Sequence, residues 1–217
     1  MKIAILLPAH GDTKAKYTQS ALNMVSHTMR ASISYRGQPT TPQIECFLLS
    51  QSNISRARNE LLSLALKWDA DYALWTDADH TFPPDALLRL LQHDLPIVAC
   101  NYPKRNPPIR PTASRNTASG QQAIDQSATD LQEAYIVGLG LCLMSMGVLS
   151  RLQERADELG NPLWPVFKEE WLKGPTLVSE DAYFCGRVRD AGIKIMVDSS
   201  LSRQVGHIGE QVLYLSG

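Results

Sequence analysis

Short apolar runs alternate with helix-like patterns along the first hundred residues. The runs predict strands at 2–8, 44–49, 72–76 and 95–100, and the first is continuous enough to predict a buried strand. Apolar residues spaced three and four apart, or capping residues before such a stretch, predict helices at 17–30, from Ser52 or Asn53 to about Lys67, and from Pro84 onward. This alternation predicts an α/β fold with a mostly parallel central sheet flanked by helices, whose ligands bind at the carboxyl ends of the strands.

The second half of the chain is less regular. A strand is predicted at about 134–145, interrupted by Gly138-Leu139-Gly140, and a helix at 179–192 leads into a last strand at 193–197. Residues 103–120 contain Lys104, Arg105, Arg110 and Arg115 and no acid, which predicts a long basic loop. We find no internal repeat and no linker, so we expect a single domain over 1–217.

Composition narrows the function classes. The chain has 217 residues, 44% of them apolar and 20% charged, with a net charge of −1. These values are typical of a globular protein and argue against non-specific binding to nucleic acid or to membranes, which usually needs a positive excess. The first apolar run is too short for a signal peptide core, and no later run reaches eighteen residues, so we expect no membrane insertion. The four cysteines lie among apolar neighbours and have no zinc-ligand spacing, which indicates reduced core thiols and a cytoplasmic location.

The sharpest chemical feature is Asp77-Ala78-Asp79, directly after a predicted strand. In an extended segment, residues two apart point to the same side, so both carboxylates could face one cation beyond the sheet edge. Hard oxygen ligands suit Mg²⁺ or Mn²⁺, which keep further positions for substrate phosphates. A bare pair of acids is common, and the alternative is that they solvate a loop or cap the next helix.

Three further elements follow at wide spacing. They are Gly138-Leu139-Gly140, Ser179-Glu180-Asp181, and His207, which lies between Gly206 and Gly209. Ser179 can cap a helix whose first turn carries acids that the helix dipole favours, and this holds whether or not the acids react. The glycines can relieve packing in a strand, and a histidine such as His207 is often a surface residue.

Taken together, these elements resemble the GT-A glycosyltransferases, particularly the family 2-like group, over essentially the whole chain. The shared pattern is D-x-D, a glycine loop, x-E-D and a late histidine, in that order. The segment Arg56-Ala57-Arg58-Asn59 also resembles the segment near the donor site of such enzymes. The resemblance implies a GT-A, Rossmann-like domain that transfers a sugar from a nucleotide-diphosphate sugar to an acceptor hydroxyl.

The resemblance also implies site roles. The catalytic base of inverting enzymes falls on Asp181, with Glu180 as the other choice within the pair. A Mn²⁺ or Mg²⁺ ion would be held by Asp77, Asp79 and His207. The residues expected near the donor are Pro8, His10, Asn53, Arg56, Arg58, Asp77, Gly138 and Gly140. The family interpretation of the two glycines is that they open space for donor and acceptor.

Three other functions fit parts of the sequence less well than sugar transfer does. A processive polysaccharide synthase is disfavoured, because the chain has no Q-x-x-R-W segment and no membrane helix. A sugar nucleotidyltransferase would carry a glycine-rich loop where this chain has Pro8-Ala9-His10. A non-catalytic carbohydrate-binding module would need neither a metal pair nor a base. The acceptor stays open between a glycan, a small molecule and modified DNA, and the basic loop is where DNA would bind.

Overall fold

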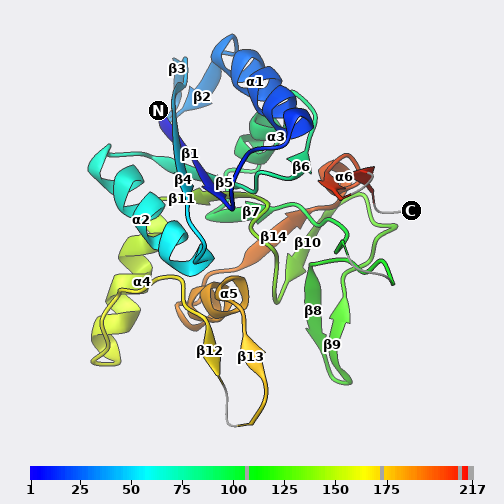
Figure 1. Cartoon of the computed structure of the whole chain (residues 1–217). Helices are drawn as coiled ribbons and strands as arrows, with labels where there is room; N and C mark the ends of the chain where they lie inside the picture. Colours follow the sequence, from blue (N-terminus) through cyan, green and yellow to red (C-terminus); the bar gives the residue numbers. More distant parts are fainter. Residues whose placement is uncertain (106–107, 172–173, 210–211, 215–217) are drawn as a thin grey trace.

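A seven-stranded sheet forms the centre of the molecule (Figure 1). The computed structural model describes residues 1–105, 108–171, 174–209 and 212–214. In sheet order the strands are β10 (Leu131–Ala134), β14 (Ile195–Asp198), β7 (Ile97–Ala99), β11 (Leu141–Ser145), β5 (Tyr72–Thr76), β1 (Lys2–Ala9) and β4 (Gln43–Ser50). The sheet therefore joins strands from both ends of the chain.

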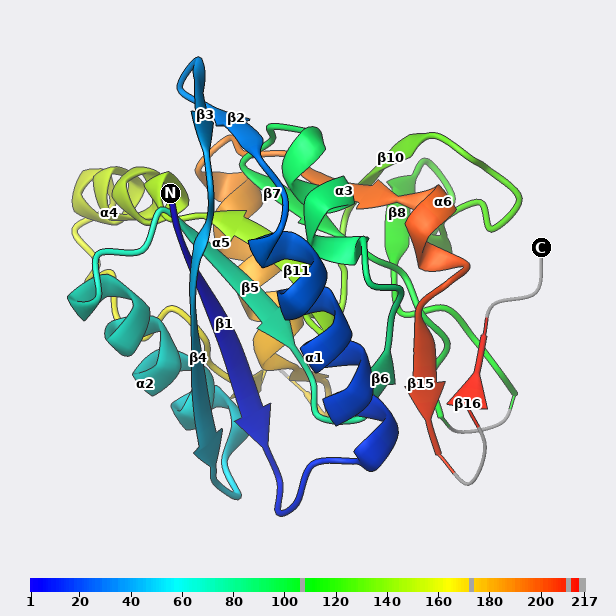
Figure 2. The same ribbon diagram turned by 90° about the horizontal axis from the view of Figure 1, so that it is seen from above.

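Five of these strands run in one direction and two run against them. β1 pairs in parallel with β4 and β5, and β14 pairs in parallel with β7. β11 is antiparallel to both β5 and β7, and β10 is antiparallel to β14. The sheet is thus mixed but mostly parallel, so the carboxyl ends of β1, β4, β5, β7 and β14 share one edge. Figure 2 shows the ends of β1, β4 and β5 at this edge.

Helices cover both faces of the sheet. The helices of the described residues are α1 (Ala15–Met29), α2 (Ile54–Lys67), α3 (Ala86–Gln92), α4 (Gly147–Glu158), α5 (Glu180–Asp190) and α6 (Ser199–Ser202). α2, α4 and α5 pack on one face and α1, α3 and α6 on the other, which gives two apolar cores. Side chains alternate between them along a strand, so Trp75 enters one core and Leu74 the other.

Smaller strand pairs surround the sheet. β6 (His80–Thr81), β15 (Gly206–Ile208) and β16 (Val212–Leu213) form a three-stranded sheet. The hairpins are β2 (Ile33–Tyr35) with β3 (Gln38–Thr40), β8 (Ser114–Thr117) with β9 (Gly120–Ala123), and β12 (Glu170–Trp171) with β13 (Leu177–Val178). The last two hairpins project from the side of the molecule on which α5 lies (Figure 1).

The α/β class and two of the predicted helix caps are confirmed. Asn53 caps α2, since its side chain accepts a hydrogen bond from Arg56 N at 2.8 Å. Ser179 caps α5 by accepting from Ala182 N. Across the described residues, no helix is long and apolar enough to cross a membrane.

Four expectations need correction. The strand expected at 134–145 is two strands. β10 ends at Ala134, where its pairing with β14 stops, and the chain re-enters the sheet as β11 at Leu141. Part of the expected loop at 103–120 is the β8–β9 hairpin, while 106–107 lie outside the described residues. Cys46 is exposed on the edge strand β4, whereas the other three cysteines are buried. Helix α4 was not predicted at all.

Candidate functional site

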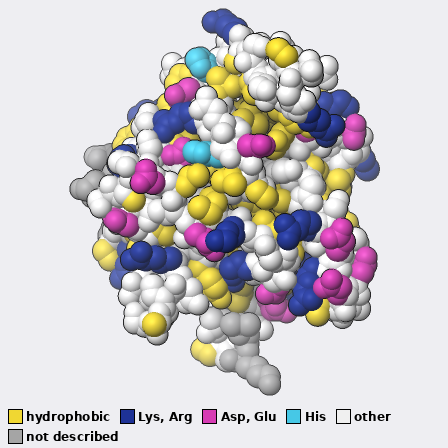
Figure 3. Space-filling model, turned by 180° about the vertical axis from the view of Figure 1, so that it is seen from behind, with side chains coloured by type: hydrophobic (Ala, Val, Ile, Leu, Met, Phe, Trp, Pro, Cys, Tyr) yellow, Lys and Arg dark blue, Asp and Glu magenta, His cyan; other side chains and the backbone are white. Residues whose placement is uncertain are grey.

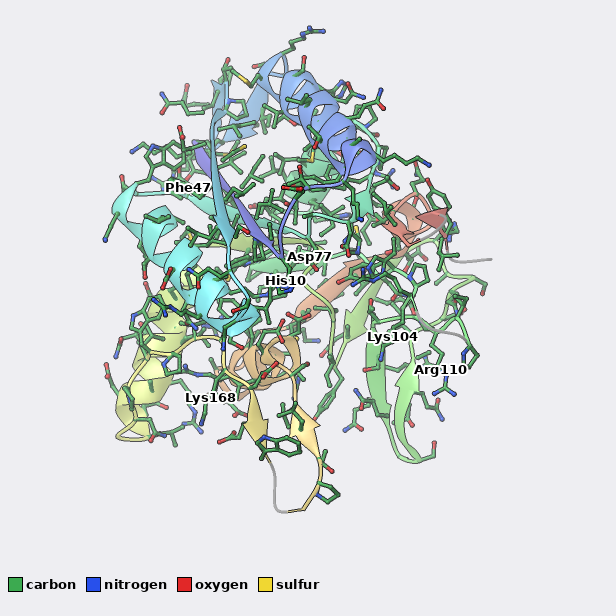
Figure 4. All side chains as sticks on the ribbon, viewed as in Figure 1. His10, Phe47, Asp77, Lys104, Arg110 and Lys168 are labelled. Carbon is green, nitrogen blue, oxygen red and sulfur yellow. The ribbon has the colours of Figure 1, made fainter. Side chains whose placement is uncertain are left out.

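The predicted site residues gather at the carboxyl edge of the sheet. His10 follows β1, Asn53 follows β4 by a short turn, and Asp77 follows β5. Figure 4 shows His10 and Asp77 at this edge, beyond the tip of β1 and between α1 and α5. This is the edge at which ligands bind in open α/β sheets.

Arg58 is the centre of a cluster of three carboxylates. Its guanidinium is 2% exposed, and Nη2 lies 3.2 Å from Asp77 Oδ1 and 3.5 Å from Asp181 Oδ1. Nε of the same group lies 3.5 Å from Glu180 Oε1. Burial alone would lower the pKa of Arg58, but the three carboxylates outweigh it and raise that pKa above its usual range. One permanent positive charge therefore faces three acids from two distant motifs.

Asp181 is held between the backbone and Arg58. Its Oδ2 accepts a hydrogen bond from Leu139 N at 3.3 Å, while Oδ1 is buried 3.5 Å from Arg58 Nη2 and makes no hydrogen bond. Burial, opposed by Arg58 and assisted by Glu180 and Asp77, raises the pKa of Asp181 to about 7. A carboxyl group with a pKa near neutrality, on a side chain that is 21% exposed, is suited to accept a proton.

Glu180 differs from its neighbour. Its side chain is 11% exposed, against 21% for Asp181, and its partner is Arg58 Nε. Neighbouring residues on a helix point about 100° apart, so the two acids of α5 meet different nitrogens of Arg58, Glu180 at Nε and Asp181 at Nη2. The geometry favours Asp181 over Glu180 as the group that meets an acceptor.

A second cluster joins Asp79, His80 and His207. His80 Nδ1 lies 3.1 Å from Asp79 Oδ1, and His207 Nε2 lies 3.5 Å from Asp79 Oδ2. One ligand atom from each residue can be chosen so that all three lie within 4.8 Å of one another. Burial alone would raise the pKa of Asp79, but the two facing histidines outweigh it and hold that pKa well below its usual range.

The small three-stranded sheet brings the two histidines together. His80 of β6 is paired directly with His207 of β15, and Ile208 N donates to Asp79 O at 2.7 Å. Directly opposed residues on antiparallel strands have their side chains on the same face, and these rings stack with centroids 4.4 Å apart. The ring of His207 is further fixed because its Nδ1 lies 2.8 Å from Pro103 O. With Nδ1 donating to that carbonyl, Nε2 is left as the ligand atom.

The two acids of D-x-D face different neighbours. The chain turns at Ala78 rather than remaining extended, and His80 N donates to Asp77 O. Asp77 therefore contacts Arg58, while Asp79 contacts the histidines. The expectation of an extended segment was wrong, and Asp77 lies outside the cluster of Asp79, His80 and His207.

The glycines at 138 and 140 are required by packing. A Cβ on Gly138 would lie 2.2 Å from the Tyr102 hydroxyl, and a Cβ on Gly140 would lie 2.6 Å from the His80 ring. Gly140 N also donates to the Tyr102 hydroxyl at 2.9 Å. The space beside these glycines is filled by Tyr102 and His80, so the idea that it stands open for donor and acceptor is corrected.

The other residues expected near the donor are spread along the same edge. Pro8 is buried within β1, and His10 is exposed, with Nδ1 3.4 Å from Gln51 O. Asn53 uses its side chain as the α2 cap. Arg56 is exposed and pairs with Glu60 one helical turn away at 2.7 Å. Arg56 thus points along the helix surface, whereas Arg58 points into the site.

Several residues of the site had no predicted role. They are His80, Tyr102 and Pro103. Arg105 was expected only as part of the basic loop, and its Nη1 lies 3.0 Å from Asp79 Oδ2. Residues 102–105 begin three positions after the end of β7, so their place near a carboxyl strand end was a usable signal. His80 directly follows Asp79 in the sequence, which was a usable signal, but nothing in the sequence pairs it with His207.

The residues of this second cluster fit a divalent ion. Asp79 supplies a carboxylate and the two histidines supply imidazoles, which are ordinary ligands of first-row metals. Both ring nitrogens of His80 are buried without a hydrogen-bond partner, and buried polar atoms in this state need an explanation. Arg105 supplies positive charge at the same carboxylate and is 54% exposed.

Comparison with known proteins identifies the fold. Residues 43–137 match the Anp1 family, whose domain is GT-A glycosyltransferase-like. The structure is similar to that of A197 from STIV, at 16% identity and a TM-score of 0.60, over 100% of this chain and 95% of that one. At this identity the likeness shows a shared GT-A fold, and it leaves activity open. No curated protein matches the sequence.

Proposed function

We propose that the chain is a metal-dependent, inverting glycosyltransferase that moves a sugar from a nucleotide-diphosphate sugar to an acceptor hydroxyl. The observation that carries the proposal is the bridge made by Arg58. One guanidinium nitrogen contacts both Asp77 of the D-x-D motif and Asp181 of the x-E-D motif. A proton acceptor and the donor-side acids thus lie around one buried charge, although 104 positions separate Asp77 from Asp181.

Asp181 acts as the base in this proposal. Its carboxylate takes the proton of the acceptor hydroxyl as the hydroxyl oxygen forms a bond to the anomeric carbon. The bond from the anomeric carbon to the diphosphate oxygen breaks at the same time, so the configuration inverts. Leu139 N holds the second oxygen of Asp181 and fixes the orientation of the carboxyl group.

Asp79 and His207 are the direct ligands of the ion in this proposal. A bound Mn²⁺ or Mg²⁺ ion would neutralise the charge that develops on the departing diphosphate. Asp77 belongs to the cluster around Arg58, so we assign it to the donor side without direct ligation. His10, Asn53 and Arg56 lie where β1 and β4 end, and together with Pro8 we assign them to the nucleoside part of the donor.

The acceptor is proposed to be a glycan or small molecule rather than DNA. The basic side chains Lys104 and Arg110 are exposed, but Lys, Arg, Asp and Glu side chains are interspersed on the face shown in Figure 3. A protein that tracks a nucleic-acid backbone usually presents a broad surface of positive charge. We also treat residues 1–217 as one domain, since the central sheet includes strands from Lys2 to Asp198.

The test is a donor screen with matched variants. The protein is incubated with Mn²⁺ and a panel of nucleotide sugars. Mannose donors come first, because Anp1 is a mannosyltransferase family. The thermal stabilisation of the protein and the release of the nucleoside diphosphate are measured. The wild type should hydrolyse or transfer one donor, and Asp79→Asn should abolish this. His27→Ala, a change of an exposed histidine on α1, should behave as the wild type.

Each rival function predicts a different result. A nucleotidyltransferase would release pyrophosphate from a nucleoside triphosphate and a sugar phosphate. A binding module would be stabilised by a sugar without turnover. Full activity in excess chelator would contradict the metal assignment while leaving sugar transfer intact.

A further inference from the structure

His80 is buried in a way that hydrogen bonding does not explain. The residue is 1% exposed, Nε2 has no hydrogen-bond partner, and Nδ1 has only the carboxylate of Asp79, 3.1 Å away and poorly aligned for a hydrogen bond. An imidazole without a partner loses the hydrogen bonds that water would have made, and this costs about 1–3 kcal/mol. The position of this ring therefore calls for a ligand of its nitrogen.

The packing around His80 leaves one of its nitrogens available. Its ring stacks on His207 and packs edge-on against Tyr102, with centroids 4.2 Å apart. Nε2 faces the backbone at Gly140, where an added Cβ would lie 2.7 Å away. Nδ1 faces the carboxylate of Asp79. Nδ1 is thus directed at the same carboxylate as Nε2 of His207.

The spacing suits three ligands of one ion. Ligand atoms about 2.1 Å from an ion and at right angles to one another lie about 3 Å apart. Here Asp79 Oδ1 is 3.1 Å from His80 Nδ1, and Asp79 Oδ2 is 3.5 Å from His207 Nε2. All three ligand atoms lie within 4.8 Å of one another, and the stacked rings must tilt toward a shared ion because each nitrogen lone pair lies in its ring plane.

We propose that His80 is a third protein ligand, so that the ion is held by one carboxylate and two imidazoles. This proposal rests on the metal site of the proposed function and deepens it by naming the class of metal. Imidazole suits first-row transition metals, whereas Mg²⁺ prefers oxygen ligands in octahedral geometry. The site should therefore bind Co²⁺, Zn²⁺ and Mn²⁺ more tightly than Mg²⁺. Among the three, affinity should be lowest for Mn²⁺.

The test measures binding of the metal alone, with no sugar donor. Affinities of the full chain for Co²⁺, Zn²⁺, Mn²⁺ and Mg²⁺ are obtained by calorimetry. The wild type should bind Mn²⁺ more tightly than Mg²⁺, and Co²⁺ and Zn²⁺ more tightly still. His80→Gln should weaken Co²⁺ binding by about 100-fold and change Mg²⁺ binding little, because it removes a nitrogen ligand. His27→Ala is the matched control and should bind as the wild type.

A second measurement does not depend on a variant that folds. Pulsed EPR of Mn²⁺ bound to the wild type counts nitrogen couplings from coordinated imidazoles. Two couplings are expected, and one would overturn the proposal. Wild-type affinities in His80→Gln would overturn it as well. If Asp79→Asn and His207→Ala alone lost the metal, the site of the proposed function would stand without His80. If neither lost it, the metal assignment of the proposed function would itself fail.

Discussion

His80 and His207 face each other across two antiparallel strands, and their rings stack at an interplanar angle of 18°. Asp79 lies beside both rings. This contact joins the segment after β5 to the last part of the described chain. The site therefore has two parts, a histidine cluster around Asp79 and a carboxylate cluster around Arg58. Each part leads to its own predictions.

Replacing the proposed base should affect chemistry more than binding. Asp181→Asn should lower transfer by about 10²-fold or more, because the amide keeps the shape but cannot take the proton. Glu180→Gln should be milder, because Glu180 contacts only Arg58 Nε among the groups described. Rates are compared at saturating donor, since a binding defect would imitate a chemical one. A larger effect of Glu180→Gln would reverse the assignment, and NMR of the product tests inversion independently.

The raised pKa of Asp181 should appear in the stability of the protein. Its ordinary value is 3.8 and its value in the folded protein is about 7, so the folded state binds the extra proton between these pH values. Raising the pH across this window should therefore lower the free energy of unfolding. Asp181→Asn should lose this part of the pH dependence and should be more stable than the wild type near pH 8. Urea unfolding of both proteins at several pH values measures the difference, and identical pH profiles would contradict the raised pKa.

Arg105 should compete with the metal. Its guanidinium lies 3.0 Å from Asp79 Oδ2 and is exposed, so a bound ion must displace it. An exposed ion pair contributes about 0.2–1 kcal/mol, so Arg105→Gln should tighten Mn²⁺ binding by at most about fivefold. Calorimetry with the metal alone measures the change. Arg110→Gln, which removes the same charge from an exposed residue of the same loop, should leave the affinity within error. Weaker binding in Arg105→Gln would instead show that Arg105 supports the site.

Gly140→Ala should disturb both the fold and the metal site. The new Cβ would lie 2.6 Å from the His80 ring and 2.8 Å from Tyr102, and overpacking of this kind costs about 1–3 kcal/mol. Gly186→Ala is the control, because a Cβ there meets nothing closer than Arg189 at 3.9 Å and the residue lies within α5. That change should be neutral or stabilising, by about 1 kcal/mol at most. Thermal unfolding and Mn²⁺ affinity are measured for both, and equal behaviour would contradict the packing role of Gly140.

Local patterns predicted the parts of the fold that local physics controls. Asn53 and Ser179 were predictable as helix caps, because their side chains satisfy amides within the same turn. The buried strands were predictable because both faces of the sheet are covered. Helix α4 was missed even though its buried residues Val148, Leu149, Leu152 and Ala156 have helical spacing. The spacing of these apolar residues was sufficient to predict the helix.

The site depends on contacts that local patterns do not contain. The acids Asp77 and Asp79 diverge because a turn replaces the extended segment on which their alignment was based. His80 acquires its environment from β15 and from Tyr102, which are distant in sequence. Arg58 was expected near the donor, but its contacts with both acids of α5 follow from the packing of α2 beside the sheet edge. Such relations require the three-dimensional arrangement.

The pairing of β15 with β6 has a consequence for shortened forms of the protein. The central sheet takes its strands from residues up to Asp198, so a released chain that stops before Gly206 keeps all seven of them. Such a chain lacks His207, which stacks on His80 and faces Asp79. We expect it to fold its central sheet and to bind metal only weakly. Metal affinity would then report whether β15 has been added to the fold.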